Sequence, residues 1–488
     1  MKNIKVDLLV IGAGSGGLVL ASGAAQLGAN VALVEGDRMG GDCLNFGCVP
    51  SKALLAAANT AHQVNHSDKF GIKAEKVSAN YADVMAYVAK KIAAIAPHDS
   101  QERFEQMGVK VIRQYAKFKD RKTIIAGEYE ITSRRIVLAT GSRAKIPNLK
   151  GLDEISYLTN ETLFDLRKAP SHLAIIGGGP IGLEMAQAHA RLGIKTTLIE
   201  MSRIMVGHER RFVEPVQKSL IDDGVNILEN TFVNRVEKDK ADIKLHLSSG
   251  KVLLVSDLLI AAGRVPNIDR LDLEQAGVKY NEFGVTVDRN LRTTNKLVYA
   301  IGDIVEGSRF THTASYHAGI VLKKILLGLP SKLRTDHIPQ VTYTDPEIAS
   351  VGMNFEDAVR RFGKKVERSC VNLKANSMPW LILQVILPLY SGSTVDSQNP
   401  TITIGNRDSD FLIKEEWNTI EETNPPTIYA CNENTAFLAI NKKPIHLTEI
   451  SENQRPLFIK GHSVMMGYLD EEQSNKAYKN NALYIAKI

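Results

Sequence analysis

The sequence predicts an α/β fold made of two three-layer units with parallel sheets, followed by a divergent C-terminal segment. The paired units are predicted because one pattern, a strand, a glycine-rich turn, a helix and a second strand, occurs twice, and each landmark of the second copy lies 165 positions after its equivalent in the first. The divergent segment is predicted because glycine becomes rare: of 36 glycines, only 4 follow residue 370. At 488 residues, 44% hydrophobic and 23% charged, the chain can bury several cores.

The first copy begins with a short apolar run. Residues 8–11 predict a buried parallel strand, followed by a glycine turn, a helix that ends near Leu27-Gly28, and a second strand at residues 31–34. The stretch from 8 to 29 carries no charge and is long enough to cross a membrane, but six glycines interrupt it. We therefore expect a strand, turn and helix here rather than a membrane span, and a cytoplasmic protein.

The glycine turn of the first copy fits the pattern GxGxxG, with Gly12, Gly14 and Gly17 at its glycine positions. Glycines leave room for the backbone to approach a pyrophosphate, whose charge is favoured at the N-terminus of the following helix. Glu35 ends the second strand, where a carboxylate can accept hydrogen bonds from ribose hydroxyls. This order of elements predicts a Rossmann-like, dinucleotide-binding unit.

The second copy repeats these landmarks in the same register. Strands are expected at 173–176 and 196–199, and the turn and acid are Gly177, Gly179, Gly182 and Glu200. Two such units predict two nucleotide sites, one for a permanently bound and one for an exchanging dinucleotide. Because Glu200 would repel a ribose 2′-phosphate, the second site is expected to prefer NAD, although Arg203 nearby leaves NADP possible.

Two of the four cysteines, Cys43 and Cys48, are close together in the sequence. Pro50 suits the first turn of a helix, which places Cys48 at a helix N-terminus, where the dipole lowers a thiol pKa. The alternatives are a zinc half-site, which would need CxxC spacing and two more ligands, and a passive disulfide, which a cytosolic chain disfavours. The pair therefore predicts redox chemistry, whereas Cys370 and Cys431 are isolated and expected to be inert.

Charge and histidine spacing exclude other classes of function. The net charge of +6 is dispersed along the chain, which argues against a nucleic-acid partner and suits small anionic ligands. His312 and His317 are five residues apart and do not share a helix face, so no metal site is expected and both are interpreted as structural.

The stretch GGDCLNFGCVPSKALL at residues 40–55, together with the two glycine turns, resembles the pyridine nucleotide-disulfide oxidoreductases, the family of dihydrolipoamide dehydrogenase, glutathione reductase and mercuric reductase. Further matching motifs are IVLATGS at 136–142, GGGPIGLE at 177–184, AGRVPN at 262–267, YAIGDI at 299–304 and VTYTDPEIASVG at 341–352. Residues 95–109 resemble the mercuric-reductase-like branch in particular. The resemblance covers about residues 4–355.

The resemblance implies specific roles for matching residues. The first turn with Glu35 would bind the ADP part of FAD, Asp303 would hydrogen-bond its ribityl chain, and the second turn with Glu200 would bind the nicotinamide cofactor. Cys48 would form a charge-transfer thiolate against the flavin, and Cys43 would exchange with the substrate. Lys52 would approach the flavin N5 and pair with Glu184. Further cofactor contacts are expected at Thr140, Gly141, Ser142, Gly263 and Arg264.

The same resemblance predicts the domain order. Residues 1–148 are expected to form the first part of a FAD-binding domain, 149–270 an NAD(P)-binding domain, 271–335 the return of the FAD-binding domain, and 336–488 a C-terminal region. Family members place a dimerisation domain there, which predicts a homodimer, but this chain diverges from about residue 369.

The divergent tail leaves the substrate open. The family's acid-base His and Glu pair is not recognisable: His446 with Glu449 or Glu452 has non-matching surroundings and is interpreted as a surface feature. The predicted function is electron transfer between NAD(P)H, FAD and the cysteine pair, with a small dithiol or disulfide as substrate. A mercuric-ion reductase is an alternative, although Cys370 and Cys431 are 61 residues apart and cannot form its vicinal pair. A diaphorase and a non-catalytic flavoprotein are the other alternative functions.

Overall fold

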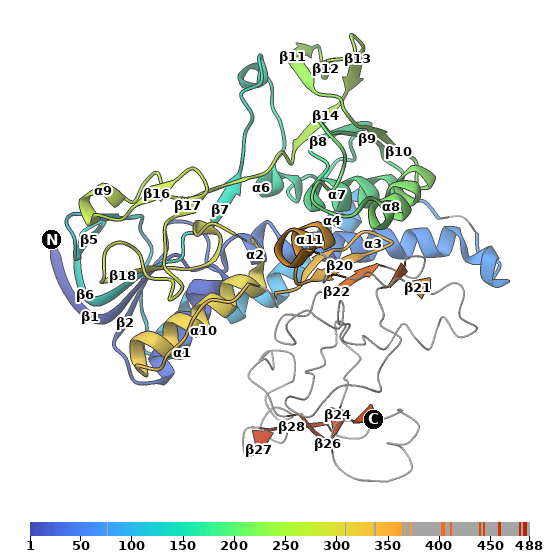
Figure 1. Cartoon of the computed structure of the whole chain (residues 1–488). Coiled ribbons are helices and arrows are strands. Elements are labelled where there is room, and N and C mark those ends of the chain that lie inside the picture. Colours follow the sequence, from blue (N-terminus) through green and yellow to red (C-terminus); the bar gives the residue numbers. More distant parts are fainter. Residues whose placement is uncertain are drawn as a thin grey trace. The chain divides into compact units, whose positions relative to one another are not determined.

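The computed structural model describes residues 1–75, 77–307, 309–335, 338–363 and 366, and beyond these only short strands (Figure 1). The chain divides into two compact bodies. The larger consists of Met1–Asn354 with Thr403–Ser409 and contains both nucleotide-binding units, and the smaller consists of Phe355–Ile402 with Asp410–Ile488. In the smaller body the described elements are α11 (Phe355–Phe362), β21 (Val371–Asn372), β23 (Asp410–Phe411), β24 (Ala439–Ile440), β25 (Lys443–Pro444), β26 (Leu457–Ile459), β27 (Tyr478–Lys479) and β28 (Ala482–Ile485). The predictions for His446, Cys370 and Cys431 lie outside the described residues.

The first sheet is parallel at its centre and carries an antiparallel meander. Its central order is β3-β2-β1-β6, with β18 parallel to the C-terminal half of β6 and β5 antiparallel to its N-terminal half. The strands are β1 (Lys2–Ile11), β2 (Val31–Val34), β3 (Lys110–Ile112), β4 (Ala116–Phe118), β5 (Thr123–Ala126), β6 (Tyr129–Leu138) and β18 (Val298–Ala300). β1 begins six residues before the strand expected at 8–11, because its polar first half pairs with β6 from Lys2 onward.

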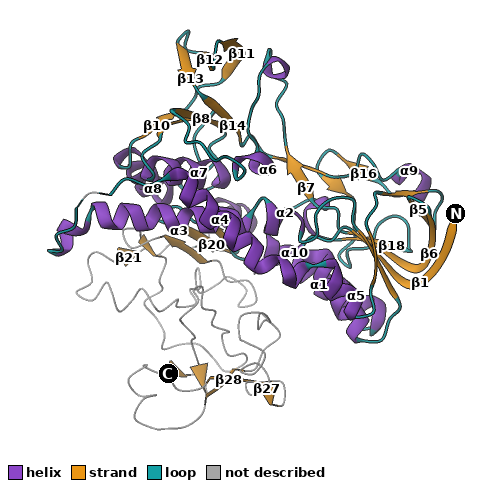
Figure 2. Ribbon diagram, turned by 180° about the vertical axis from the view of Figure 1, so that it is seen from behind, coloured by secondary structure: helices purple, strands orange, loops and turns teal. Residues whose placement is uncertain are grey.

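Alternating side chains of this sheet build two cores. Leu8 and Val10 pack with α1 (Ser15–Gln26), α5 (Gln101–Gln106) and α10 (Thr311–Leu326). On the other face, Leu9 and Ile11 pack with the β4–β5 meander and with α9 (Leu273–Ala276). Helices α1 and α10 lie side by side in both ribbon views (Figures 1 and 2). The predicted three-layer arrangement is therefore confirmed in the first unit.

The second sheet repeats the first in register. Its order is β10-β9-β8-β14, all parallel. Leu173 pairs with Thr196 and Ile176 with Ile199, just as Leu8 pairs with Val31 and Ile11 with Val34, each 165 residues earlier. The strands are β8 (His172–Ile176), β9 (Lys195–Ile199), β10 (Val225–Leu228) and β14 (Asp257–Ile260), and the helix after the glycine turn is α7 (Pro180–Arg191).

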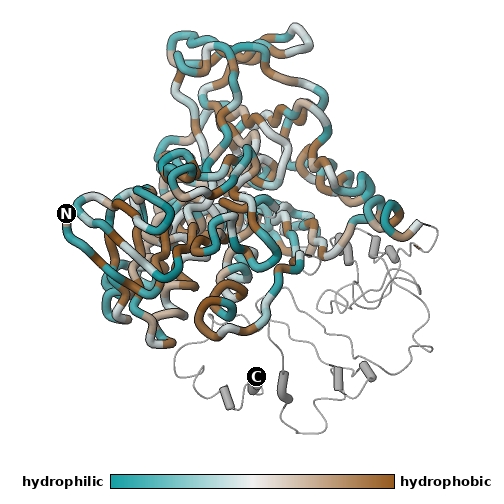
Figure 3. Tube along the Cα trace, turned by 60° about the vertical axis from the view of Figure 1, so that its left-hand side comes forward, coloured by the Kyte–Doolittle hydropathy of each residue, from teal (hydrophilic) through white to brown (hydrophobic). Residues whose placement is uncertain are grey.

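Two further layers cover the second sheet. On one face lie α7 and α8 (Arg210–Asp222), and on the other an antiparallel meander of β11 (Val233–Asp239), β12 (Asp242–Leu247) and β13 (Val252–Val255). Hydrophobic and hydrophilic residues alternate closely along the described chain, as the coloured tube in Figure 3 shows. Within the described residues, no helix combines the length and apolar character needed to cross a membrane.

The crossover between β2 and β3 links the two sheets. It contains α2 (Gly41–Asn45), α3 (Cys48–Asn65) and α4 (Tyr81–Ile95), and α3 and α4 lie side by side (Figure 2). Ala53, Leu54 and Leu55 of α3 belong to the same core as Leu183 and Met185 of α7. A segment inserted in the first unit therefore packs on the helix of the second, and the cysteine pair begins this segment.

Candidate functional site

The first and third glycines of both turns are required by packing. A Cβ on Gly12 would lie 2.3 Å from Ala139 O, and one on Gly17 would lie 1.9 Å from Gly12 O. The second turn repeats these approaches: 2.3 Å from Gly177 to Ala261 O, and 1.9 Å from Gly182 to Gly177 O. Gly12 and Gly177 also have φ of 108° and 120°, which other residues rarely adopt. Gly12 and Gly177 thus let each turn pack against the residue that follows a neighbouring strand, β6 or β14, and Gly17 and Gly182 let each turn close onto its own backbone.

The middle glycines have no such packing reason. A Cβ on Gly14 would meet nothing nearer than Gly41 Cα at 4.0 Å, and one on Gly179 would meet nothing within 4 Å. Both residues are helix N-caps, of α1 and α7, without a capping side chain, and neither helix has an acidic residue in its first turn. The N–H groups and the positive end of each helix dipole thus stay available to an anion, and this geometry fits a pyrophosphate.

Glu35 and Glu200 hold their turns through the same pair of hydrogen bonds. The Glu35 carboxylate accepts from Ala13 N at 2.6 Å and Asp37 N at 2.7 Å. The Glu200 carboxylate accepts from Gly178 N at 2.7 Å and Ser202 N at 2.9 Å. Burial raises the pKa of Glu35, and the backbone N–H groups of Ala13 and Asp37 oppose this rise. Each acid is thereby fixed beside its glycine turn, where a ribose would lie.

Cys48 is the first residue of α3, as Pro50 predicts, and it meets the start of another helix. Its sulfur lies 3.1 Å from the hydroxyl of Thr311, the first residue of α10. Neither helix has a capping side chain or an acid in its first turn. Cys43 lies on α2, half-buried, while Cys48 is exposed, and both are free thiols. Two helix N-termini therefore converge on one sulfur.

The two thiols have opposite proton affinities. A hydrogen bond from the Cys43 thiol, a second from Thr311 and the charge of Lys52 lower the pKa of Cys48 to about 6, although nearby protein atoms remove part of the water around the sulfur and oppose this shift. The hydrogen bond to Cys48, together with burial, raises the pKa of Cys43. At neutral pH the pair therefore holds one proton on Cys43 and a thiolate at Cys48.

Lys52 and Glu184 connect the thiol helix to the second unit. Lys52 Nζ lies 2.7 Å from the buried Glu184 carboxylate on α7, a pairing that the resemblance implies. The other Glu184 oxygen accepts from Tyr343 N at 3.0 Å, and Lys52 Nζ lies 4.4 Å from the centre of the Tyr343 ring. The ammonium group is thus held one helical turn from Cys48.

Asp303 lies in a second polar cluster of the first unit. It accepts a hydrogen bond from Ser142 Oγ at 2.7 Å, and Arg264 Nε donates to the same hydroxyl at 2.7 Å. Burial raises the pKa of Asp303, and Ser142 and Arg264 oppose this rise. Arg264 also lies 3.3 Å from Asp42, beside Cys43. Three sequence motifs far apart in the chain are therefore brought together next to the thiol pair.

The remaining predicted contacts flank this cluster. Thr140 and Asn267 exchange two hydrogen bonds, at 2.7 and 2.9 Å. Gly141 and Gly263 have φ of 70° and 105°, and a Cβ on either would meet nothing within 4 Å. These glycines keep the backbone beside Ser142 and Arg264 free of side chains.

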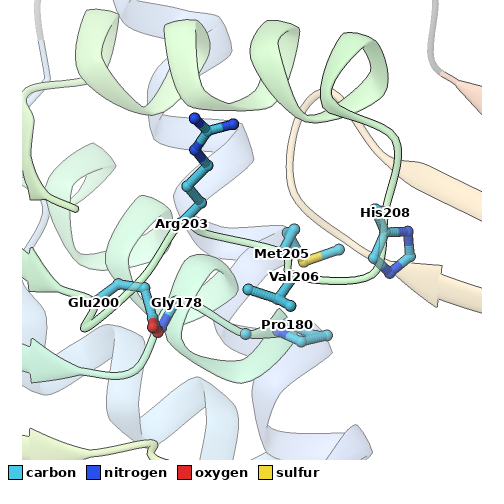
Figure 4. Close-up of a pocket in the computed structure, with 8 residues that line it drawn as sticks. Gly178, Pro180, Glu200, Arg203, Met205, Val206 and His208 are labelled. Atoms are coloured by element: carbon cyan, nitrogen blue, oxygen red, sulfur yellow. The ribbon is translucent and has the colours of Figure 1, made fainter. Parts of the chain in front are cut away.

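The second glycine turn opens into a pocket of about 250 Å³ lined by Gly178, Gly179, Pro180, Glu200, Arg203, Met205, Val206 and His208. In Figure 4 the Glu200 carboxylate lies beside Gly178, whereas the Arg203 side chain points away from both. The acid therefore dominates the charge at the base of the pocket.

Sequence reasoning missed Thr311 and gave the nearby histidines a structural role. His312 contacts the Pro339 carbonyl at 2.7 Å, and His317 accepts from Gly302 N at 3.2 Å, one residue before Asp303. The only signal for Thr311 was its place at the start of a helix, and that place has no meaning until the fold brings Cys48 to it.

Comparisons with known proteins agree with this geometry. The family model described as pyridine nucleotide-disulphide oxidoreductase matches residues 6–318. A mercuric reductase of Bacillus cereus is 34% identical over 381 residues, which are 76% of this chain and 60% of that protein. A dihydrolipoyl dehydrogenase of Geobacillus stearothermophilus is 36% identical over 359 residues, 72% of this chain and 76% of the relative. The HOCl-induced flavoprotein disulfide reductase RclA from Escherichia coli, as its Cu(II) complex, has the same fold, with a TM-score of 0.69, 24% identity, and coverage of 84% of this chain and 91% of RclA.

Proposed function

This chain belongs to the pyridine nucleotide-disulphide oxidoreductase family, and from that premise we propose that it transfers electrons between NAD(P)H and a small disulfide or dithiol through FAD and the Cys43 and Cys48 pair. The family's cofactors are FAD and NAD(P)H. The observation that carries the proposal is the place of the Cys48 sulfur, 3.1 Å from the Thr311 hydroxyl where two helix N-termini meet, with Lys52 one helical turn away. These surroundings favour the thiolate and lower the pKa of Cys48 to about 6. FAD, when bound, supplies the two-electron carrier between a nicotinamide and the thiol pair.

Different residues of the chain would contact different parts of FAD and of the thiol pair. Gly14 and Glu35 would hold the pyrophosphate and ribose of FAD, and Asp303 with Ser142 its polyhydroxyl chain. Lys52 keeps a positive charge beside Cys48, and Glu184 neutralises that charge in the buried part of the site. Because this ion pair joins α3 to α7, the position of the thiols depends on the helix that carries the second nucleotide turn.

The thiol chemistry balances with NADH as the reductant and one proton from solvent for each disulfide reduced. Cys43 passes its proton to Cys48, its hydrogen-bond partner, and the Cys43 sulfur attacks one sulfur of a substrate disulfide, while the other substrate sulfur leaves and takes that proton from Cys48. Cys48, again a thiolate, then attacks the Cys43 sulfur, the second substrate sulfur leaves as a thiol with a proton from solvent, and a Cys43–Cys48 disulfide remains. Two electrons from NADH restore the dithiol. The reverse sequence oxidises a dithiol and reduces NAD⁺.

NADH is the proposed nicotinamide cofactor. The Glu200 carboxylate, fixed by Gly178 N and Ser202 N at the base of the second pocket, would repel a 2′-phosphate. Arg203 points away from this carboxylate, so it offers no compensating charge at that spot (Figure 4).

A mercuric-ion reductase is the second candidate. It is favoured because relatives named mercuric reductase, from Bacillus cereus and Lysinibacillus sphaericus, are 34% and 32% identical to 76% of this chain. Two soft thiolates are also ligands that Hg(II) prefers.

We further propose that the protein is a cytoplasmic homodimer. The scarcity of cysteines supports the compartment, and the family resemblance supports the dimer.

The test compares substrates on purified protein. Lipoamide, Hg(II) and a quinone are offered with NADH, and Cys43→Ser and Cys48→Ser are assayed beside the unchanged chain. The proposal expects NADH-dependent lipoamide reduction that both substitutions abolish. Hg(II) reduction without lipoamide reduction would favour the second candidate, and quinone reduction that survives both substitutions would contradict the thiol relay.

A further inference from the structure

Helix α2, which carries Cys43, is too short to hold its own position. It has five residues, follows Gly40 at a φ of 87°, and has no capping side chain. Isolated helices shorter than about 12 residues are marginal in water, so contacts with other elements must fix α2. Leu44 is buried and anchors one face of it. The two ends of α2, and with them the Cys43 sulfur, depend on contacts from outside the helix.

The side chain of Asn160 contacts both ends of α2. Asn160 Nδ2 donates to Asp42 Oδ1 at 2.8 Å and to the Phe46 carbonyl at 3.4 Å. Asp42 directly precedes Cys43, and Phe46 is the residue that ends the helix. An amide nitrogen carries two N–H groups, so it can serve both acceptors. Asn160 is only 8% exposed, so these two contacts are made in the interior of the protein.

The backbone of Asn160 is fixed by the second unit, not by the first. Two residues earlier, Leu158 exchanges two backbone hydrogen bonds with β14 of the second sheet, at 2.7 and 2.8 Å. Thr159 then caps α6 (Asn160–Leu163), whose first residue is Asn160. The amide that holds the helix of Cys43 is therefore anchored to the sheet that carries the second glycine turn.

The partner of this amide, Asp42, carries a charge beside the thiol pair. The hydrogen bond between the two thiols dominates their pKa values, and the negative charge of Asp42 adds a smaller rise at both. Arg264 Nη2 lies 3.3 Å from Asp42 Oδ1 and offsets this charge. With Arg264 beside it, the carboxylate can anchor α2 while Cys48 stays a thiolate.

We propose that Asn160 is the positioning residue for Cys43, which it keeps within reach of Cys48 by holding both ends of α2. The equilibrium between a dithiol and its disulfide follows the effective concentration of one thiol at the other, and that concentration is high only while the helix of Cys43 is fixed. The redox equilibrium of the pair thereby depends on a side chain of the second nucleotide-binding unit. This inference rests on the proposed thiol relay.

The test measures that equilibrium on the purified flavoprotein in mixtures of reduced and oxidised glutathione. Formation of the Cys43–Cys48 disulfide converts one oxidised glutathione into two reduced molecules, and the remaining thiols are alkylated and counted by mass spectrometry. Asn160→Ala is expected to lower the equilibrium constant for disulfide formation about 3- to 10-fold, because the hydrogen bonds to both ends of α2 are lost.

Two isosteric changes separate hydrogen bonding from packing. Asn160→Asp keeps the shape of the side chain but has no N–H to donate and faces the Asp42 carboxylate, so it should lower the constant at least as much as Asn160→Ala. In the double variant Asp42→Asn/Asn160→Asp, the new amide can donate to the new carboxylate. This variant is expected to recover part of the loss.

Asn295→Ala is the matched control. Asn295 is 2% exposed, and its Nδ2 also donates to two acceptors, the carbonyls of Arg121 at 2.8 Å and Ala276 at 2.9 Å. Its loss should lower stability in urea comparably and leave the glutathione equilibrium unchanged.

The inference is overturned if Asn160→Ala and Asn160→Asp keep the constant of the unchanged chain, if Asn295→Ala lowers it as much as they do, or if the double variant recovers nothing. An unchanged chain that forms no Cys43–Cys48 disulfide in oxidised glutathione would overturn the proposed function itself, and the inference with it.

Discussion

The two nucleotide-binding units share one backbone frame but carry different insertions. Strand register, glycine contacts and the acid's two backbone hydrogen bonds coincide at an offset of 165 residues. Between its second and third strands, however, the first unit inserts α2, α3 and α4, which carry Cys43, Cys48 and Lys52. At the same place the second unit has α8 and an open pocket. The shared strands and glycine turns are therefore suited to a nucleotide in both units, and the inserted helices add the thiol pair to the first unit.

The helices of the molecule differ in whether a side chain caps their N-terminus. Helix α4 is capped by the Asn80 side chain, α5 by Ser100, and α6 (Asn160–Leu163) by Thr159. Helices α1, α3, α7 and α10 have no capping side chain, and neither have α2, α8 and α9. The N-termini of α1 and α7 lie at the two predicted phosphate positions, and those of α3 and α10 meet at the Cys48 sulfur. Their unsatisfied N–H groups are therefore available for ligands and for a thiolate.

The largest effect on stability is expected at the first glycine turn, where one glycine is needed for packing and another leaves space for the pyrophosphate. Gly17→Ala places a Cβ 1.9 Å from Gly12 O and should lower the free energy of unfolding by about 3 kcal/mol or more. Gly14→Ala meets only Gly41 Cα at 4.0 Å, so it should leave stability within about 1 kcal/mol while the protein loses flavin. Chemical denaturation and the flavin content of the purified variants check both. Equal stability losses would contradict the distinction.

A buried ion pair found only in the second unit gives the next effect. Arg191 is 2% exposed and lies 2.8 Å from Asp223 and 2.9 Å from Asp345, whereas its counterpart in the first unit, Gln26, is exposed. Arg191→Met should lower the free energy of unfolding by about 3 kcal/mol, because the buried Asp223 would lose its arginine partner and keep only His62 and Gln187. Gln26→Met is the control and should change it by less than about 0.5 kcal/mol. If urea denaturation finds the two variants alike, the network does not stabilise the unit.

Thr311 tests how the Cys48 thiolate is stabilised. Thr311→Val removes a hydrogen bond to the charged form, so the pKa of Cys48 should rise by about one unit from its value of about 6. At pH 6 this leaves about fivefold less thiolate, measured as slower alkylation of the reduced protein by iodoacetamide.

Two residues further along the same helix, Thr313→Val is the control. Within the described residues, the buried Thr313 hydroxyl has no hydrogen-bond partner, so its removal should leave the alkylation profile unchanged. A Thr311→Val profile that overlays the unchanged one would show that the hydroxyl does not stabilise the thiolate.

The smallest effect is expected for cofactor choice in the second pocket. Glu200→Gln removes the charge that faces a 2′-phosphate but keeps the size of the side chain, and the ratio of kcat/KM for NADPH to that for NADH should rise about 5- to 10-fold. The unchanged chain should prefer NADH. A clear NADPH preference before any substitution would contradict the role given to Glu200.

Much of the frame could be predicted from sequence because its signals are local and repeated. The turn glycines and the helix that begins at Cys48 follow from short motifs and a constant offset, and the pairing of Lys52 with Glu184 is implied by the family resemblance. The first half of β1 was missed because Lys2, Asn3 and Lys5 are polar, and their strand pairing depends on β6, more than a hundred residues later.

The contacts that tune the site could not be predicted. Thr311 and Cys48 are 263 positions apart, and nothing in either segment specifies that two helix starts meet. Tyr115 packs on Gly36 although four α-helices, α2 to α5, separate the two residues in the sequence, so this contact depends on where β3 joins the sheet. Local sequence patterns therefore identify residues that can take part in the site, but long-range packing determines which of them are in contact.

One measurement tests the central claim, that Cys48 is a thiolate held against a bound flavin, most directly. The purified protein is titrated anaerobically with NADH while its absorption spectrum is recorded, for the unchanged chain and for Cys48→Ser. We predict a yellow protein in which NADH produces a long-wavelength thiolate-to-flavin band that Cys48→Ser abolishes. A colourless protein that takes up no flavin, or a band that persists in Cys48→Ser, would contradict the account.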